Sequence, residues 1–169
     1  MRRLFLIRHA KTETGESMAD IDRALVPRGS ADASRLADWF RKHRQTADLL
    51  VHSNAARARE TADIFAEHWL PDRPRLELPE LYGAPWREIV KAIRSLPDTA
   101  HTVALVGHNP GIHDAARLLT GSGDVAARAR LGEKMPTCAC AALDFAVEHW
   151  AKLETGKGAL TLFMTPEGF

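Results

Sequence analysis

Two short apolar runs lead almost directly into a histidine, and this feature most limits what the chain can fold into. The run at 3–7 stops at Arg8-His9, and the run at 102–106 is followed by Gly107 and then His108. Short, continuous apolar runs that end in polar residues are typical of strands buried on both faces of a parallel sheet. We therefore expect a sheet whose strands carry their chemically active residues at the carboxyl ends.

Segments with helical spacing alternate with these runs. Apolar side chains recur at helical intervals over 33–40, 58–69 and 89–96, and a further apolar run at 49–51 separates the first two of these segments. Strand, helix and strand in alternation predict an α/β fold: a three-layer α/β/α sandwich with a mostly parallel sheet, helices on both faces and no cap domain. No linker or repeat divides the chain, so we expect one domain over 1–169.

The ends of the helices and the second half of the chain give weaker signals. Ser53 or Asn54 is expected to cap the helix over 58–69, and Asn109 the helix after His108, with Pro110 at its first position. Three further strands are expected around 76–78, 140–145 and 159–164, and the glycine-rich residues 121–137 are expected to form an exposed connection.

Charge and cysteine content exclude several classes of protein. Among 169 residues, 23 Lys and Arg face 22 Asp and Glu, a balance that argues against nucleic acid as a partner. The N-terminal apolar run is too short for a signal peptide, and no run approaches the ~20 apolar residues of a membrane span. Cys138 and Cys140 lie two positions apart and are interpreted as small strand residues, so we expect a reducing, cytoplasmic environment.

The polar residues at the strand ends are expected to converge. In open α/β sheets, ligands bind beyond the carboxyl ends of the strands, where Arg8, His9 and His108 would lie. Arg57 falls in the first turn of a predicted helix that follows a strand, so it faces the same edge. Arginine favours bidentate contact with phosphate or carboxylate, and a helix start adds positive potential. The expected ligand is a small dianion such as phosphate.

Four segments in this region resemble the motifs of one family. Residues 6–10 resemble its opening Arg-His-Gly signature, although Ala10 replaces the glycine, and three later segments match in order: Arg23-Ala24-Leu25-Val26-Pro27-Arg28-Gly29, Ser53-Asn54-Ala55-Ala56-Arg57-Ala58-Arg59-Glu60-Thr61 and Val106-Gly107-His108-Asn109-Pro110. Together they are similar to the histidine phosphatase (phosphoglycerate mutase-like) superfamily. The short chain and the sequence Arg8-His9-Ala10-Lys11 point to its SixA-like phosphohistidine phosphatase branch.

The resemblance implies specific roles. His9 would be the nucleophile, phosphorylated during turnover, and Arg8, Arg57 and His108 would surround the transferring phosphoryl group. An imidazole with an ordinary pKa of ~6.5 has a useful neutral fraction at pH 7, as a nucleophile requires. Because the guanidinium groups neutralise the phosphoryl oxygens, we expect neither a metal nor another cofactor.

The general acid is less firmly indicated. Family members that act on alcohol phosphates use a carboxyl group to protonate the leaving oxygen, and Glu80 occupies the matching position; the alternative is a surface carboxylate. A phosphohistidine substrate makes a smaller demand, because imidazole leaves readily once protonated. Tyr82 and Trp86 follow closely and are expected either to rim the pocket or to pack into the core.

Other polar residues have simpler interpretations. Arg23 either lines the phosphate site or pairs with Asp20 or Asp22. The remaining histidines lack the spacing of metal ligands and are interpreted as surface or structural residues: His43, His52, His68, His101, His113 and His149.

The short spacing between Glu80 and His108 leaves little room for a cap, so the site should be open. An open pocket can accept a side chain presented by a protein. We expect a phosphatase that hydrolyses phosphohistidine on a phosphocarrier or phosphotransfer protein. The alternatives are a broader phosphomonoesterase acting on phosphotyrosine or small phosphate esters with Glu80 as acid, and a module that binds phosphate without turnover.

Overall fold

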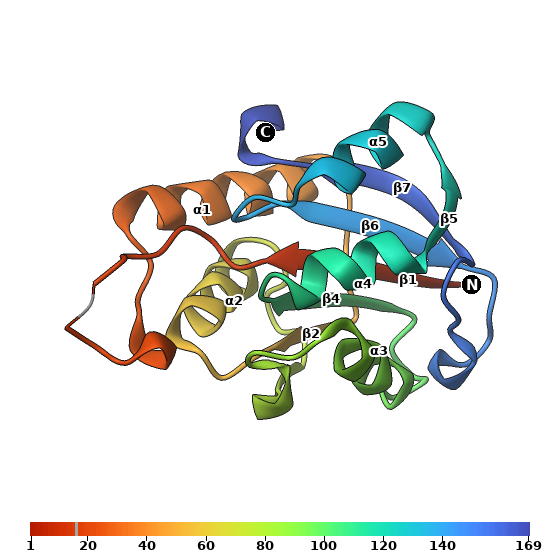
Figure 1. The fold of residues 1–169 in the computed structure, drawn as a ribbon, viewed down its shortest axis with the longest axis horizontal. Helices are drawn as coiled ribbons and strands as arrows, with labels where there is room; N and C mark the ends of the chain where they lie inside the picture. Colours follow the sequence, from red (N-terminus) through yellow and green to blue (C-terminus); the bar gives the residue numbers. More distant parts are fainter. Residues whose placement is uncertain (16) are drawn as a thin grey trace.

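The computed structural model describes residues 1–15 and 17–169, which fold around a seven-stranded sheet (Figure 1). The strand order is β3-β2-β4-β1-β6-β7-β5. The strands are β1 (Arg2–Arg8), β2 (Leu49–His52), β3 (Arg75–Glu77), β4 (Thr102–Gly107), β5 (Thr120–Gly123), β6 (Cys140–Phe145) and β7 (Gly158–Met164). Strands β3, β2, β4 and β1 run parallel, and β5 is parallel to β7, while β6 is antiparallel to both of its neighbours. The prediction of a mostly parallel sheet is confirmed.

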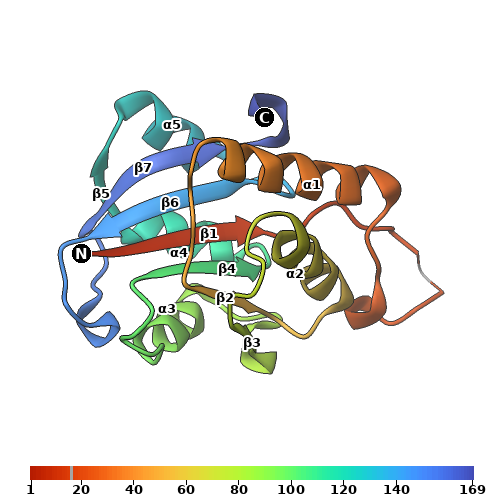
Figure 2. The ribbon, with the colours of Figure 1, turned by 180° about the vertical axis from the view of Figure 1, so that it is seen from behind.

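Helices cover both faces of this sheet. They are α1 (Pro27–Lys42), α2 (Ala56–His68), α3 (Trp86–Arg94), α4 (Gly111–Leu119) and α5 (Val125–Glu133). Helices α3 and α4 lie in front of the sheet in Figure 1, and α1 and α2 in front of it in Figure 2, which is seen from behind. The three layers of the predicted sandwich are therefore present.

Alternation along β1 explains why both faces are buried. Leu4 and Leu6 pack in a core with Ile89 of α3 and α4 residues, whereas Phe5 and Ile7 pack in a second core with α1 and α2. Side chains along a strand point alternately to opposite faces, so a continuous apolar run fills both cores at once. This is the physical reason that the first apolar run forms the centre of the sheet.

Two local predictions are wrong. Residues 121–137 do not form a simple exposed connection, because they contain most of β5 and all of α5. The expected helix caps also differ: α2 has Ala55 at its N-cap and α4 has Pro110, and neither makes a side-chain capping hydrogen bond. Ser53 and Asn109, with polar side chains close to these helix starts, instead bond to other groups, His108 and the Met135 carbonyl among them.

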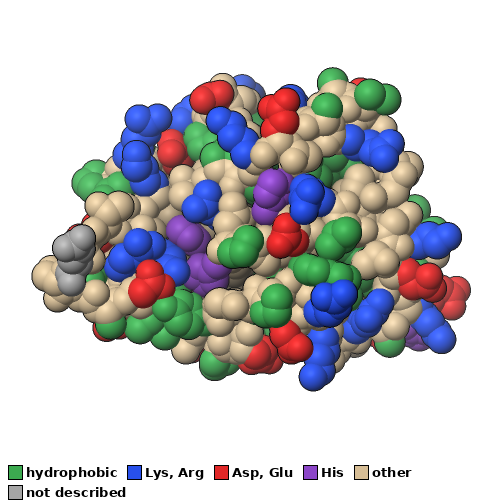
Figure 3. Space-filling view, in the orientation of Figure 1, with side chains coloured by type: hydrophobic (Ala, Val, Ile, Leu, Met, Phe, Trp, Pro, Cys, Tyr) green, Lys and Arg blue, Asp and Glu red, His purple; other side chains and the backbone are tan. Residues whose placement is uncertain are grey.

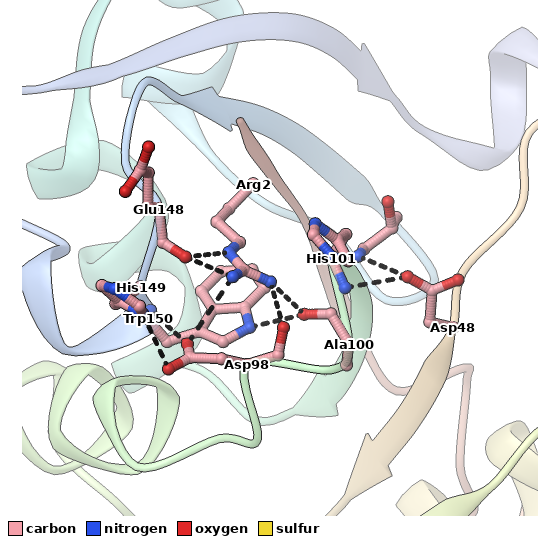
Figure 4. Close-up of polar contacts among 9 residues, drawn as sticks. Arg2, Asp48, Asp98, Ala100, His101, Glu148, His149 and Trp150 are labelled. Atoms are coloured by element: carbon pink, nitrogen blue, oxygen red, sulfur yellow. Dashed lines mark hydrogen bonds and ion pairs between the residues drawn. The ribbon is translucent and has the colours of Figure 1, made fainter.

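The amino-terminal end of the sheet is held by a buried arginine (Figure 4). The guanidinium of Arg2 donates to the backbone carbonyls of Asp98, Ala100 and Glu148, and Arg2 is 4% exposed. The Asp98 carboxylate in turn accepts the backbone N–H of Trp150 at 2.9 Å. These contacts join β1 to the turn before β4 and to the 3-10 helix η3 (Trp150–Lys152).

The opposite end of the sheet is where the parallel strands β1, β2 and β4 finish together. The chain from Glu80 to His108 is taken up by the end of the 3-10 helix η2 (Pro79–Leu81), by α3 and by β4.

Among the helices in the described part of the chain, none is both long and apolar enough to cross a bilayer.

Candidate active site

The ends of β1 and β4 bring two histidines close together. Arg8 pairs with Gly107 in the parallel register of these strands, and the backbone N–H of His9 donates to the Gly107 carbonyl at 3.0 Å. Consequently the rings of His9 and His108 lie with their centroids 5.1 Å apart. Their exposed fractions are 5% and 6%, so both rings are almost fully withdrawn from water.

Arg57 reaches the same place from the first turn of α2. Thr61, one turn further along this helix, accepts the backbone N–H of Ala10 at 3.0 Å and donates to the Arg57 carbonyl at 2.7 Å. This buried hydroxyl fixes α2 against the residue that follows His9. Arg57 is itself only 6% exposed, so its guanidinium lies at the edge of the histidine pair rather than in solvent.

The tautomer of His9 follows from its partner. Its Nδ1 lies 2.8 Å from the Ala10 carbonyl oxygen, which can only accept, so Nδ1 carries the proton and donates. Nε2 then bears the lone pair. Burial, with smaller contributions from His108 and the arginines, lowers the pKa of His9 to about 3. The ring is therefore neutral at pH 7, the form that a nucleophile needs.

His108 is held differently. Its Nε2 lies 2.6 Å from the Ser53 hydroxyl, which also accepts the backbone N–H of Ala55 at 3.3 Å. Burial, followed by the positive charge of Arg57, lowers the pKa of His108 to about 4. Ser53 was expected only as a helix cap, and its contact with His108 could be found only from the tertiary structure.

Several N–H groups in this cluster are buried without a protein partner. Arg8 Nε, Arg57 Nε and His108 Nδ1 make no hydrogen bond to the described residues. Burial, followed by the positive charge of Arg57, lowers the pKa of Arg8. Buried donors of like charge without partners are the features of an anion site. Figure 3 shows histidine side chains in a hollow of this face, with Lys and Arg side chains around them.

The structure clarifies the two interpretations of Arg23. Its Nε lies 3.3 Å from the Asp20 carboxylate, an ion pair within the turn that includes the 3-10 helix η1 (Asp20–Asp22). Because Asp20 also binds Arg57, Arg23 lies near the pocket as well as pairing with Asp20, and its charge contributes to the lowered pKa of His108. The same carboxylate accepts a hydrogen bond from Arg57 Nη2 at 3.1 Å.

Of the three candidates around Glu80, only Tyr82 meets the histidine cluster. The Tyr82 ring lies 5.7 Å from that of His108, centroid to centroid, at 80°. Glu80 is exposed on η2, and its carboxylate bonds to no described residue. Trp86 is partly buried against the core that contains Ile89, so it belongs to the packing of α3.

The cysteine, histidine and carboxylate side chains of the described residues form no disulfide and no metal-binding cluster. Cys138 and Cys140 are buried and unpaired, and burial raises the pKa of both thiols. Within residues 1–15 and 17–169, His, Cys, Asp and Glu do not gather in groups of three able to hold a metal ion.

Comparison with known proteins gives this cluster a family context. Residues 4–99 match the model of the histidine phosphatase superfamily (branch 1). The chain belongs to the histidine phosphatase superfamily. The matched residues include His9 and Arg57, and His108 follows them at the same end of the sheet.

Relatives of this superfamily member extend over nearly the whole chain. An uncharacterized protein of Mycobacterium tuberculosis, Rv1276c, is 36% identical over 95% of this chain and 99% of its own. The proposed phosphohistidine phosphatase SixA of Nakamurella multipartitia is 29% identical, with a TM-score of 0.85 over 98% of this chain and 96% of its own. A protein histidine phosphatase SixA complexed with tungstate shares the fold at 19% identity, with a TM-score of 0.76 over 97% of each chain.

Proposed function

We propose that this protein is a cytoplasmic phosphatase that hydrolyses phosphohistidine on another protein, without a metal ion, through a phosphorylated His9. The observation that carries the proposal is the His9 ring itself. It is buried, neutral and bonded through Nδ1 to the Ala10 carbonyl, which leaves the Nε2 lone pair for attack. The membership of the chain in the histidine phosphatase superfamily and its likeness to SixA proteins support phosphohistidine as the substrate class.

The reaction divides into two transfers. In the first, the other nitrogen of the substrate imidazole takes a proton from solvent, the Nε2 lone pair of His9 forms a bond to phosphorus, and the bond from phosphorus to the substrate nitrogen breaks. The electron pair of that bond returns to the substrate imidazole, which leaves neutral. In the second, a water oxygen attacks phosphorus, the bond to Nε2 breaks, and the water protons leave with phosphate and solvent. His9 is then regenerated neutral.

The arginines and His108 stabilise the charge that moves onto the phosphoryl oxygens. Arg8 and Arg57 each keep a buried Nε–H without an acceptor in the part of the chain that the structure describes. Ser53 is fully buried, and among the described residues its O–H has His108 Nε2 as acceptor, so we assign the O–H as donor to Nε2, which leaves the proton of His108 on Nδ1. His108 then donates to the same anion. One such preorganised donor is worth ~3–4 kcal/mol in the transition state.

An open site favours a protein as the source of the phosphoryl group. The chain between Glu80 and His108 forms only the end of η2, α3 and β4, so the segment that would carry a cap is taken up by the core fold. A phosphohistidine on a protein surface projects its ring outward and needs access more than enclosure.

A decisive test compares two phosphate donors. We expect wild type to release phosphate much faster from a histidine-phosphorylated carrier protein than from an aryl phosphate, and His9→Ala to lose both activities. The matched control is His101→Ala, an exposed histidine at the other end of the sheet (Figure 4), which should retain activity. Turnover of the aryl phosphate alone would instead establish the broader phosphomonoesterase.

That second candidate has one structural observation in its favour. Tyr82, two residues beyond Glu80, lies beside His108, so the turn that carries Glu80 borders the site. For alcohol leaving groups Glu80 would supply the proton. If Glu80→Gln slows hydrolysis of an alcohol phosphate and leaves phosphohistidine hydrolysis unchanged, the two chemistries share this pocket.

A further inference from the structure

One exposed carboxylate joins three separate parts of the site. Asp20 Oδ2 accepts hydrogen bonds from the Tyr82 hydroxyl at 2.5 Å and from Arg57 Nη2 at 3.1 Å. The other oxygen, Oδ1, lies 3.3 Å from Arg23 Nε. The backbone carbonyl of Asp20 accepts a further bond from Arg57 Nη1 at 2.8 Å. Asp20 thus contacts α2, the segment after η2 and its own turn.

The contacts with Arg57 use only part of its guanidinium. A guanidinium is planar and carries five N–H bonds, of which Asp20 accepts two. The remaining three include the buried Nε–H that lacks a partner among the described residues. Because the group is rigid, fixing Nη1 and Nη2 also fixes the direction of Nε–H.

The contact with Tyr82 fixes a wall of the pocket. The hydroxyl of Tyr82 is bound by Asp20, while its ring lies beside His108 and 5.8 Å from Arg57 Cζ. The backbone allows this approach because Gly111, at the start of α4, packs directly on the Ala84 carbonyl; a Cβ there would lie 1.9 Å from that oxygen. The Tyr82 segment is therefore held close to His108 from two sides.

We propose that Asp20 is a positioning residue for phosphoryl transfer, which holds the Arg57 guanidinium with its Nε–H directed to the phosphoryl oxygens. This inference rests on the proposed function of the His9 and Arg57 pocket. Asp20 does not touch the reacting atoms; it acts through Arg57 and, by way of Tyr82, on the wall beside His108.

A competing role for Asp20 predicts the opposite sign. A carboxylate bound to Arg57 could occupy the place of the substrate anion, and its negative charge by itself disfavours a phosphate nearby. If Asp20 acted in this way, any neutral residue at position 20 would bind anions more tightly than wild type. A positioning residue predicts weaker binding.

Two neutral substitutions separate charge from geometry. Asp20→Asn and Asp20→Ala remove the same charge, but only Asn retains an oxygen that can accept from Arg57 and Tyr82. We expect tungstate affinity and kcat/KM for an aryl phosphate to fall in the order wild type, Asn, Ala, with a total loss of ~10-fold to ~100-fold, since small misplacements of binding groups have effects of this size. The loss in kcat should exceed the rise in KM.

The matched control is Asp22→Ala in the same 3-10 turn. Asp22 is exposed, and its carboxylate pairs with nothing in the described chain, so the variant should match wild type in both assays. Tyr82→Phe removes only the hydroxyl and should lose less than Asp20→Ala. An equal loss in Tyr82→Phe would overturn the assignment to Arg57, because the effect would then reside in the Tyr82 wall.

The proposal fails in two further ways, each distinct from failure of the proposed function. Asp20 variants that bind tungstate as tightly as wild type, or more tightly, would overturn the positioning role while leaving the phosphatase intact. A wild-type protein that neither binds tungstate nor hydrolyses any phosphate would overturn the function itself. Urea unfolding of each variant shows whether a loss reflects the fold.

Discussion

At the scale of single residues, the two histidines of the pocket are distinguished by what their nitrogens touch. A backbone carbonyl fixes the proton of His9 on Nδ1, and a serine hydroxyl meets Nε2 of His108. These contacts leave a lone pair on one ring and a donor on the other, facing a pocket of arginines. Identical side chains thus acquire complementary roles from their neighbours.

Acid should destabilise the folded protein through these rings. The pKa of His9 is lowered to about 3 and that of His108 to about 4, whereas histidines in an unfolded chain titrate near ~6.5. Between pH 6.5 and 4 the unfolded chain therefore binds more protons, and stability falls as pH falls, by up to ~1.4 kcal/mol per pH unit for each ring. Urea unfolding at pH 4.5 to 7 measures this slope.

The pH dependence of the unfolding free energy should arise from the two histidines of the pocket. His108→Gln removes one titrating ring and should flatten the dependence, whereas His101→Gln, a substitution of an exposed histidine, serves as the control. Equal slopes for wild type and His108→Gln would contradict the lowered pKa. Activity should reflect the lowered pKa in a different way: because His9 stays neutral, kcat/KM should show no loss near pH 6.5 from protonation of the nucleophile.

Ser53→Ala tests the assignment of the His108 proton. Without the hydroxyl, His108 Nε2 loses the one hydrogen-bond partner that it has among the described residues, and the Nδ1–H form is no longer favoured. We expect kcat to fall by roughly tenfold, because one transition-state donor is weakened but not removed. Nitrogen NMR of the imidazoles should show His108 as a mixture of tautomers. An unchanged Nδ1–H tautomer in Ser53→Ala would refute the role of Ser53.

At the scale of secondary structure elements, the site depends on how α2 is fastened to the end of β1. Thr61 makes this connection through a buried hydroxyl that accepts from Ala10 and donates to the Arg57 carbonyl. The helix start and the strand end thus carry their functional residues, Arg57 and His9, in a fixed relation. A slip of either element would separate the arginine from the nucleophile.

Thr61→Val should therefore weaken both fold and site. Valine fills almost the same volume but leaves the buried N–H of Ala10 without an acceptor, at an expected cost of ~1–3 kcal/mol in unfolding free energy. Thr61→Ser retains the hydroxyl and is the matched control for activity. Urea unfolding and kcat/KM measure the two effects, and a fully active, fully stable Thr61→Val would show that the connection is dispensable.

The sequence predicts most elements where side-chain pattern decides the structure. Strands β1, β2 and β4 and helices α1 to α3 follow from apolar runs and helical spacing, and α4 was expected from the residues at its start. Helix α5 was missed because it buries only Leu131, so it has no apolar stripe. Strand β5 was missed because its sequence, Thr-Gly-Ser-Gly, pairs through backbone alone.

The same distinction holds for the site. His9, His108, Arg8 and Arg57 are predictable because strand ends and a helix start bring them to one edge. The contacts of Asp20 with Arg57 and Tyr82, and of Ser53 with His108, are not, because each depends on how a loop or strand end closes against a distant element. Contacts between side chains that are far apart in the sequence leave no periodic pattern from which they could be predicted.

At the scale of the whole molecule, the two ends of the sheet have separate roles. The carboxyl ends of the parallel strands carry the histidines and arginines, while the amino ends are fastened by the Arg2 network of Figure 4. A substitution in the Arg2 network should therefore leave the activity of the site at the carboxyl ends unchanged, provided that the protein stays folded.

Substitution of Arg2 tests this division. Arg2→Met removes a buried guanidinium that donates to the carbonyls of Asp98, Ala100 and Glu148, and it leaves those acceptors with fewer partners. We expect a loss of ~2–5 kcal/mol in unfolding free energy, the usual range when one side of a buried charged network is deleted. The activity per folded molecule should not change, because the site lies at the other end of the strands.

The neighbouring arginine provides the control for this prediction. Arg3 pairs with Asp144 through its Nε at 2.7 Å, but its side chain is 37% exposed. Exposed pairs contribute ~0–1 kcal/mol, so Arg3→Met should shift the urea midpoint far less than Arg2→Met. Equal shifts of the urea midpoint in the two variants would show that the burial of Arg2 adds nothing to stability beyond the loss of its charge. A fall in kcat for folded Arg2→Met would show instead that the two ends of the sheet are coupled, since no contact of Arg2 reaches the histidines directly.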